Sequence, residues 1–391
     1  MSQTLTLRHD PRALALLLAA SLTVMAAATI SPALPGLQKQ FPDTAENAYL
    51  IRLLVPAPSL AVVLTAALCG IAADRIGRRP LLLVGVALFA MSGSAGLVLQ
   101  DLHLLLASRL ALGVALAMIM TAQSALLGDY YTGPALHALS GAQLAARNFG
   151  GFAFITLAGS LASVSARLPF AIYALPALLL PFFARVITEA PRPNRTTPRP
   201  LSPAQGWRLP VALLSLGQGV VTMVFFTMPT QLPFYLEWSG HDAPALTGAV
   251  LGTLMITGGI AALGYPRIRK ITSDAAIWAA GLGAMGLGFV ILTGSALTPL
   301  AFAGAAMIGA GYALAIPGFT ARALELTPAH RRGAAAAMLT ASVFLGQFLS
   351  PLFSIPAIAR WGWQAAGSGL GVILGASALA AAILALRPGK L

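Results

Sequence analysis

The stretch Gly70-Ile71-Ala72-Ala73-Asp74-Arg75-Ile76-Gly77-Arg78-Arg79-Pro80 decides how this chain folds. It is a short basic segment between two apolar runs, 48–70 and 80–99. Each run has about the 20 residues that a helix needs to cross a bilayer. Arginine and lysine collect in the loops on the cytoplasmic side of a membrane. The stretch therefore predicts a tight cytoplasmic loop between two membrane-spanning helices.

Composition places most of the chain in lipid. Charged residues make up 9% of the 391 residues, against about 25% in ordinary soluble domains. Apolar residues make up 58%, and the mean hydropathy is +0.82. The net charge of +13 is spread over short loops between apolar runs, so it indicates membrane topology and no nucleic-acid partner. The single cysteine, Cys69, excludes an internal disulfide, and no phosphate-binding loop or metal-ligand spacing predicts a cofactor or metal.

The apolar runs predict an all-α membrane protein with twelve transmembrane helices in two pseudo-symmetric six-helix bundles. The predicted spans are 13–36, 48–70, 80–99, 104–127, 136–161, 168–187, 208–236, 245–266, 275–294, 299–321, 333–357 and 363–386. A polar, proline-rich connector at 188–207 separates an N-terminal bundle, 1–187, from a C-terminal bundle, 208–391. Pro229 and Pro233 predict a kink or break in the seventh span.

The basic residues also predict the orientation in the membrane. With both termini in the cytoplasm, 18 of the 24 Lys and Arg residues fall on the cytoplasmic side and three on the outer side. The remaining three, Arg52, Arg109 and Arg147, fall inside spans. We therefore expect a multi-pass protein of the plasma (inner) membrane.

The spacing Gly-x-x-x-Asp-Arg-x-Gly-Arg-Arg resembles the signature loop of the major facilitator superfamily, between its second and third helices. The resemblance covers essentially the whole chain and implies a monomeric secondary transporter that works by alternating access. It also implies a cytoplasmic gate, with Arg78 and Arg79 pairing with Asp129 and Asp74 facing the start of the eleventh helix. The implied gating residues are Asp74, Arg75, Gly77, Arg78, Arg79 and Asp129.

Other motifs place the chain nearest the drug and sugar efflux branches of that family. Ile30-Ser31-Pro32-Ala33-Leu34-Pro35 resembles the end of their first helix. Arg109 and Gly113 resemble a motif linked with proton movement, although Leu112 stands where glutamine is usual. Ile155-Thr156 replace the Gly-Pro of the drug:proton antiporters, which departs from that branch's antiport motif.

Charges inside spans are costly and point to function, so they guide the prediction of a substrate site. Arg147 falls near the middle of the fifth span, whereas Arg52 and Arg109 lie nearer the outer surface, where they either line a cavity or extend to the interface. No carboxylate falls at the same depth, which favours an anionic or polar solute, because arginine suits carboxylate and phosphate groups. The candidate substrate-binding residues are Arg147, Asn148, Gln143, Arg52, Arg109, Gln123, Gln218 and Gln347. Thr23, Thr222 and Thr257 are further polar candidates. Each polar residue has the alternative role of an interhelical hydrogen bond.

The sequence thus predicts a secondary active transporter of a small organic solute, embedded in a lipid bilayer, with its site at the midplane between the two halves. The alternative is a proton-coupled drug or sugar efflux pump, in which Glu237 is the nearest acid that could exchange a coupling proton. An enzyme is not expected, because the five histidines are scattered over separate loops and termini.

Overall fold

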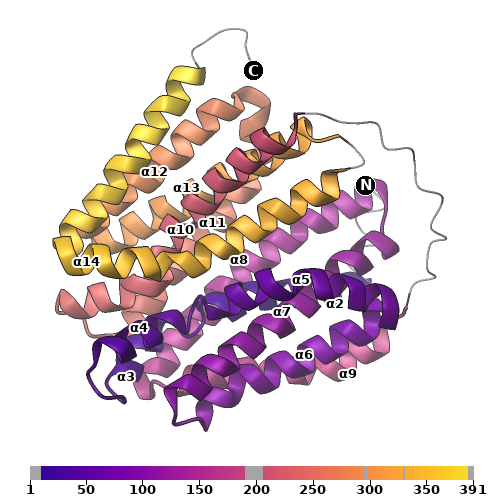
Figure 1. Ribbon diagram of the computed structural model, residues 1–391, viewed down its shortest axis with the longest axis horizontal. Helices are drawn as coiled ribbons and strands as arrows, with labels where there is room; N and C mark the ends of the chain where they lie inside the picture. The colour runs from indigo at the N-terminus through magenta and orange to yellow at the C-terminus, as the bar shows by residue number, and fades with distance from the viewer. Residues whose placement is uncertain (1–9, 190–205, 295–296, 329–330, 386–391) are drawn as a thin grey trace.

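The computed structural model describes residues 10–189, 206–294, 297–328 and 331–385. This part of the chain is helical throughout and contains no strand (Figure 1). Ten of its helical segments are long and apolar enough to cross a membrane. The prediction of an all-helical, multi-pass membrane protein is therefore confirmed. The predicted linker lies mostly at 190–205, outside the described residues, as do both chain ends.

Residues 10–189 form the earlier group of helices. They are α2 (Pro11–Ala28), η1 (Ser31–Ala33), α3 (Leu34–Gln38), α4 (Ala45–Leu53), α5 (Ala57–Ile76), α6 (Arg78–Ser94), η2 (Ala95–Leu97), α7 (Leu102–Tyr130), α8 (Gly133–Val164), η3 (Leu168–Ala174) and α9 (Leu175–Val186). The later helices are α10 (Arg208–Trp238), α11 (Pro244–Ile271), α12 (Asp274–Gly294), α13 (Thr298–Leu326) and α14 (Arg332–Ala385). In Figure 1 the earlier group lies below and the later group above, with α8 beside α11 where they meet.

Two long helices differ from an ordinary single span. α14 has 54 residues, and Gly362, at φ 76°, interrupts its helical backbone and turns the chain back (Figure 1). Only glycine adopts this φ readily, which is why the bend falls at Gly362. Gly362 lies between the predicted spans 333–357 and 363–386. α8 has 32 residues and is not among the ten apolar segments; it carries Arg147 and Asn148 in its interior.

Proline alters two of the predicted spans in opposite ways. The predicted span 48–70 is wrong as one helix, because the chain leaves α4 after Leu53 and restarts as α5 at Ala57, on either side of Pro56. Of the kink or break predicted in the seventh span, the break does not occur, because α10 continues through Pro229 and Pro233. Pro233 has no N–H to give to the Pro229 carbonyl, and the Ser31 hydroxyl donates to that carbonyl instead.

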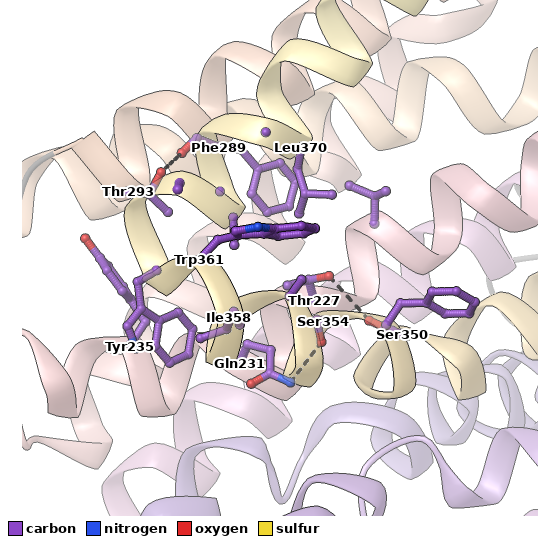
Figure 2. Close-up of a pocket in the computed structure, with 18 of the residues that line it drawn as sticks. Thr227, Gln231, Tyr235, Phe289, Thr293, Ser350, Ser354, Ile358, Trp361 and Leu370 are labelled. Atoms are coloured by element: carbon purple, nitrogen blue, oxygen red, sulfur yellow. Dashed lines mark hydrogen bonds between the residues drawn. The ribbon is translucent and has the colours of Figure 1, made fainter.

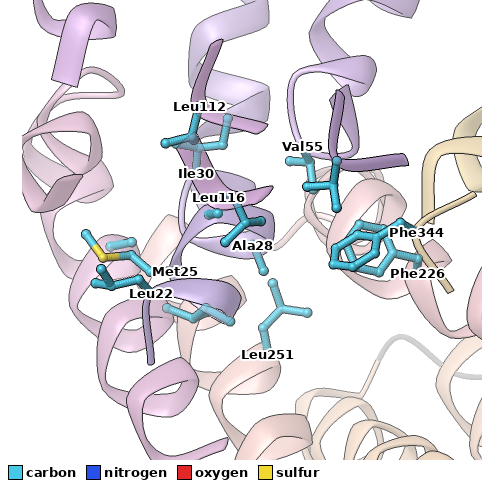
Figure 3. Close-up of a cluster of buried hydrophobic side chains, with 14 of the residues drawn as sticks. Leu22, Met25, Ala28, Ile30, Val55, Leu112, Leu116, Phe226, Leu251 and Phe344 are labelled. Carbon is cyan, nitrogen blue, oxygen red and sulfur yellow. The ribbon is translucent and has the colours of Figure 1, made fainter. Parts of the chain in front are cut away.

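The core joins the two groups of helices. Figure 3 shows Leu22 and Met25 of α2 near Leu116 of α7, and Phe226 of α10 near Phe344 of α14. All five belong to one cluster of buried apolar side chains. Close backbone contact also joins the groups at Gly159 of α8, where a Cβ would lie 2.8 Å from the Cα of Gly248 in α11.

The helix ends form two surfaces of different charge. We call the surface with Arg78, Arg79, Arg269 and Lys270 the basic end. The surface with Lys39, Arg167 and Arg360 is the opposite end. In Figure 1 the bend of α14 and the loops around α3 and α4 lie at the opposite end, on the left.

Candidate functional site

An ion-pair cluster holds the two groups of helices together at the opposite end. The Lys39 ammonium lies 2.7 Å from a carboxylate oxygen of Glu237 and 2.8 Å from one of Asp242. Lys39 follows α3, whereas Glu237 lies in the last turn of α10. Hydrogen bonds to Asp242 and to Glu237 raise the pKa of Lys39, so the amine stays charged. We call these three residues the outer clasp.

Arg52 supports the same contact from α4. Its Nη1 donates to the Gln38 side chain at 3.2 Å and to the Ala48 carbonyl at 2.9 Å. Its guanidinium carbon lies 3.8 Å from the ring centroid of Phe234 in α10, a cation–π distance. Arg52 therefore binds the two groups of helices to each other near the outer clasp.

Two helix pairs continue the contact toward the middle of the molecule. Between α5 and α14, the Ser59 hydroxyl donates to the Gln347 side-chain oxygen at 2.6 Å. Between α8 and α11, contact runs from Gly159 and Gly248 to Asn148, whose Cβ lies 3.0 Å from where a Cβ of Gly259 would stand. Asn148 and Gln347, both predicted to bind substrate, thus lie where the two groups of helices meet.

Three glycines toward the basic end have open surroundings. A Cβ on Gly70 of α5, Gly141 of α8 or Gly333 of α14 would meet nothing within 4 Å. The ion pairs described at this end each stay within one group of helices, as Arg78 with Asp129 and Arg269 with Glu325 do. The contacts described above between the two groups therefore lie at the opposite end and along the pairs α5–α14 and α8–α11.

Arg147 lies along α8, between its end at the basic end and its contact with α11 at Gly159. It is 14 residues beyond Gly133, about 21 Å along α8 at 1.5 Å per residue, near the middle of the helix. Its Nε is buried and has no hydrogen-bond partner, and no ion pair to Arg147 is formed among the described residues. Burying a guanidinium nitrogen without a partner is costly. An acceptor for Arg147 Nε would therefore be stabilising, and the described residues do not supply one.

Three further polar side chains, on α2, α7 and α8, also have a buried atom without a partner among the described residues. Gln143 lies one turn before Arg147, on the face of α8 that packs against α2 through Gly150 and Gly151. The unpartnered buried atoms of this set are Gln143 Nε2, Gln123 Oε1 of α7 and Thr23 Oγ1 of α2. α2 packs against both α7 and α8. We refer to Thr23, Gln123, Gln143 and Arg147, which lie on these three helices, as the polar cluster.

Arg109 lies elsewhere, in the interior of the earlier helices. It is fully buried, and its Nη2 donates to the Gly93 carbonyl at 2.6 Å. The guanidinium carbon lies 5.0 Å from the ring centroid of Phe170 and 4.8 Å from that of Tyr173. Gln218 is likewise buried within α10, where its Oε1 accepts a bond from Thr320 at 3.5 Å. The structure does not bring either residue into the polar cluster.

Comparison with known proteins identifies the family. The model of the Major Facilitator Superfamily matches residues 16–278. The chain belongs to the Major Facilitator Superfamily. It is a membrane transporter and not an enzyme. No curated protein sequence matches it.

Solved structures of this superfamily share the fold at low sequence identity. A D-xylose-proton symporter matches with a TM-score of 0.79 and 17% identity, over 95% of this chain and 96% of that one. The inward open xylose transporter XylE from E. coli matches with a TM-score of 0.76 and 16% identity, over 97% and 96%. The nucleoside transporter NupG (D323A mutant) matches with a TM-score of 0.73 and 14% identity, over 96% and 99%.

The signature loop of the superfamily forms a compact joint here. Gly77 has φ 103° and separates α5 from α6, so glycine suits this position. The expected ion pair between Arg78 and Asp129 is present, whereas Arg79 donates to the Ala184 carbonyl at 2.8 Å. Asp74 and Arg75 lie in the last turn of α5.

Sequence reasoning missed Glu189 in this joint. Its carboxylate accepts the backbone N–H groups of Arg78 at 2.8 Å and Arg79 at 2.9 Å. These are the first two residues of α6, and an anion is favoured at a helix N-terminus. Glu189 is the first acid after α9, but nothing in its sequence position indicated that it would return to residue 78.

Proposed function

We propose that this superfamily member is a secondary active transporter of a small polar solute that carries a negative charge. The observation that carries the proposal is the unpartnered Nε of Arg147 near the middle of α8, together with the unpartnered atoms of Thr23, Gln123 and Gln143 on α2, α7 and α8. A bound solute would supply the missing partners. Arginine binds carboxylate and phosphate groups through two parallel hydrogen bonds, so an anionic group is the expected partner of Arg147.

We also infer that transport proceeds by alternating access and that the structure represents the inward-facing state. The outer clasp and the contact between Gly159 and Gly248 support closure at the outer side. The open surroundings of Gly70, Gly141 and Gly333 support separation at the cytoplasmic side. In the other state Asp74, Arg75, Gly77, Arg78, Arg79 and Asp129 would together face the second group of helices and complete the cytoplasmic gate, and the Arg78–Asp129 pair, which lies within one group, is already formed here. Likeness to the inward open xylose transporter agrees with this assignment.

The proposed frame has twelve spans in two six-helix bundles, residues 1–187 and 208–391, joined by a cytoplasmic linker at 188–207. Counting α8 and the two arms of α14 as spans supports this number. The excess of arginine at the basic end supports cytoplasmic termini in a plasma membrane.

A proton-coupled exporter of drugs or sugars is the second candidate. One observation favours proton coupling: Glu237 is paired with Lys39 in the outer clasp. A proton on Glu237 would remove one of the two ion pairs of Lys39 and favour opening at the outer side. The match to a D-xylose-proton symporter is consistent with a proton as the coupling ion.

The test is a thermal-shift screen of the purified protein with probes that differ in charge. D-Xylose and D-xylonate share a carbon skeleton, 5-aminolevulinic acid adds an amine, and tetraphenylphosphonium is a lipophilic cation. A ligand that binds only the folded state raises the melting temperature. We expect stabilisation by anionic members and a smaller effect of neutral ones. Stabilisation by the cation alone would refute the anionic site, and pH-dependent stabilisation by D-xylose alone would favour the second candidate.

A further inference from the structure

One cavity lies within the later group of helices, away from the polar cluster. It has a volume of about 520 Å³ and lies between α10, α12 and the two arms of α14. Ligand pockets in proteins are about 300–1,000 Å³, so the cavity is large enough for a substantial molecule. Figure 2 shows the indole of Trp361 lying across it, between Phe289 and Leu370 on one side and Ser354 on the other.

The mouth of this cavity faces the lipid. Phe353, Trp361 and Ile373 line it and are 60%, 63% and 59% exposed. Large apolar side chains that are exposed on a membrane-spanning helix contact acyl chains. The polar groups inside are paired with each other: Gln231 donates to Ser354 at 2.9 Å, and the hydroxyls of Thr227 and Ser350 lie 3.4 Å apart (Figure 2). The interior therefore offers mainly apolar contact.

The length and charge of the cavity match one lipid of the outer leaflet. From Trp361 at the bend of α14 to Ser350 the helix spans 11 residues, about 16 Å. This is about half of the 30 Å hydrocarbon thickness of a bilayer. Arg360 lines the cavity beside the bend and is exposed, and it makes no ion pair with any described residue. An exposed arginine at the membrane surface attracts anionic headgroups, and tryptophan is favoured at the same level.

We propose that this cavity binds one acyl chain of an anionic phospholipid, with the headgroup phosphate on Arg360. The site is independent of the proposed solute site, because it lies inside one group of helices and faces the bilayer. α10 lines the cavity and also carries Glu237 of the outer clasp, so a bound lipid contacts a helix that joins the two halves.

Three variants separate the parts of this site. Arg360→Gln removes the headgroup contact. Gly369→Leu fills the cavity, since Gly369 lines it and a Cβ there would meet nothing within 4 Å. Gly375→Leu is the matched control: it lies six residues further along the same helix, is equally open, and does not line the cavity.

The experiment is native mass spectrometry of the delipidated protein with phosphatidylglycerol or phosphatidylcholine of identical acyl chains. Wild type is expected to retain phosphatidylglycerol in preference by about fivefold, the equivalent of about 1 kcal/mol for one arginine at the surface. Arg360→Gln should remove the preference, Gly369→Leu should lose both lipids, and Gly375→Leu should behave as wild type. Equal retention of both lipids by wild type would overturn the headgroup assignment. Full retention by Gly369→Leu would overturn the cavity.

Discussion

Replacing Lys39 with glutamine should shift the protein away from its outward-closed state. The change removes the charge that holds both Glu237 and Asp242 but keeps a polar side chain of moderate length. The side chains of Lys39, Glu237 and Asp242 are 56%, 31% and 59% exposed, so both pairs are accessible to water. Exposed ion pairs contribute about 0.2–1 kcal/mol each, so two contribute about 0.4–2 kcal/mol. The population of outward-open molecules should rise by about twofold to thirtyfold.

Spin labels across the outer side measure this population. Ala45 and Ala243 are exposed and lie in opposite groups of helices at the opposite end, so a label on each reports their separation. Cys69 must first be replaced by serine. Lys39→Gln should broaden the distance distribution toward longer values, and the difference from wild type should shrink at 1 M salt, where charges are screened within about 3 Å.

Lys270→Gln is the matched control. Lys270 is an exposed lysine at the basic end, and it makes no ion pair within the described part of the chain. The control should leave the label distances of wild type unchanged. If Lys39→Gln also leaves them unchanged at low salt, the outer clasp does not hold the outer side closed, and the assignment of the conformational state loses its support.

Three further results are expected. The pKa of Lys39 is raised above its ordinary value of 10.5, and the outer clasp is stabilising only while this amine is charged. Raising the pH through that pKa should therefore open the outer side. Label distances that stay constant across this pH range would contradict the prediction. Asp129→Asn should lower the free energy of unfolding by about 1–3 kcal/mol, because its ion pair with Arg78 is mostly buried. Adding Arg78→Gln to that variant should cost little more, because the pair is already broken. Additive losses in denaturant unfolding would show that the two side chains do not interact. Arg109→Ala should cost about 3 kcal/mol of stability, because it leaves the Gly93 carbonyl unpaired and empties a packed site; an unchanged melting temperature would contradict this structural role.

Local sequence signals predicted most of the helices and failed where the outcome depends on a distant partner. The apolar runs indicate the spans because lipid imposes their length. The residues around Pro56 look apolar throughout, so their break into α4 and α5 was not evident from composition. Pro229 and Pro233 predicted a kink or a break, and the helix is not broken there. The cost of the lost backbone bond is offset by Ser31, whose position beside α10 is set by tertiary packing.

In the candidate site, too, the sequence predicted the position along a helix but not the neighbours in space. The depth of Arg147 follows from counting residues along one helix, and the structure keeps it near the middle of α8. The three arginines inside spans look alike in sequence, yet Arg109 bonds carbonyls in the core and Arg52 stacks on Phe234. Which neighbour each one meets depends on how the helices pack. For the same reason, Lys39 and Glu237 could not be paired from a chain in which they are 198 residues apart.

The central claim is that Arg147 anchors an anionic solute, and ligand affinity in Arg147 variants tests it most directly. The affinity of the anion that stabilises wild type most should be measured in wild type, Arg147→Gln and Arg147→Lys. Arg208→Gln, an exposed arginine of α10 at the basic end, is the control. A charge-assisted hydrogen bond contributes about 1.5–3 kcal/mol. Arg147→Gln should therefore lower the affinity for the anion by about tenfold to a hundredfold. D-xylose affinity and the Arg208→Gln control should be unchanged. Equal anion affinity in wild type and Arg147→Gln would contradict the claim.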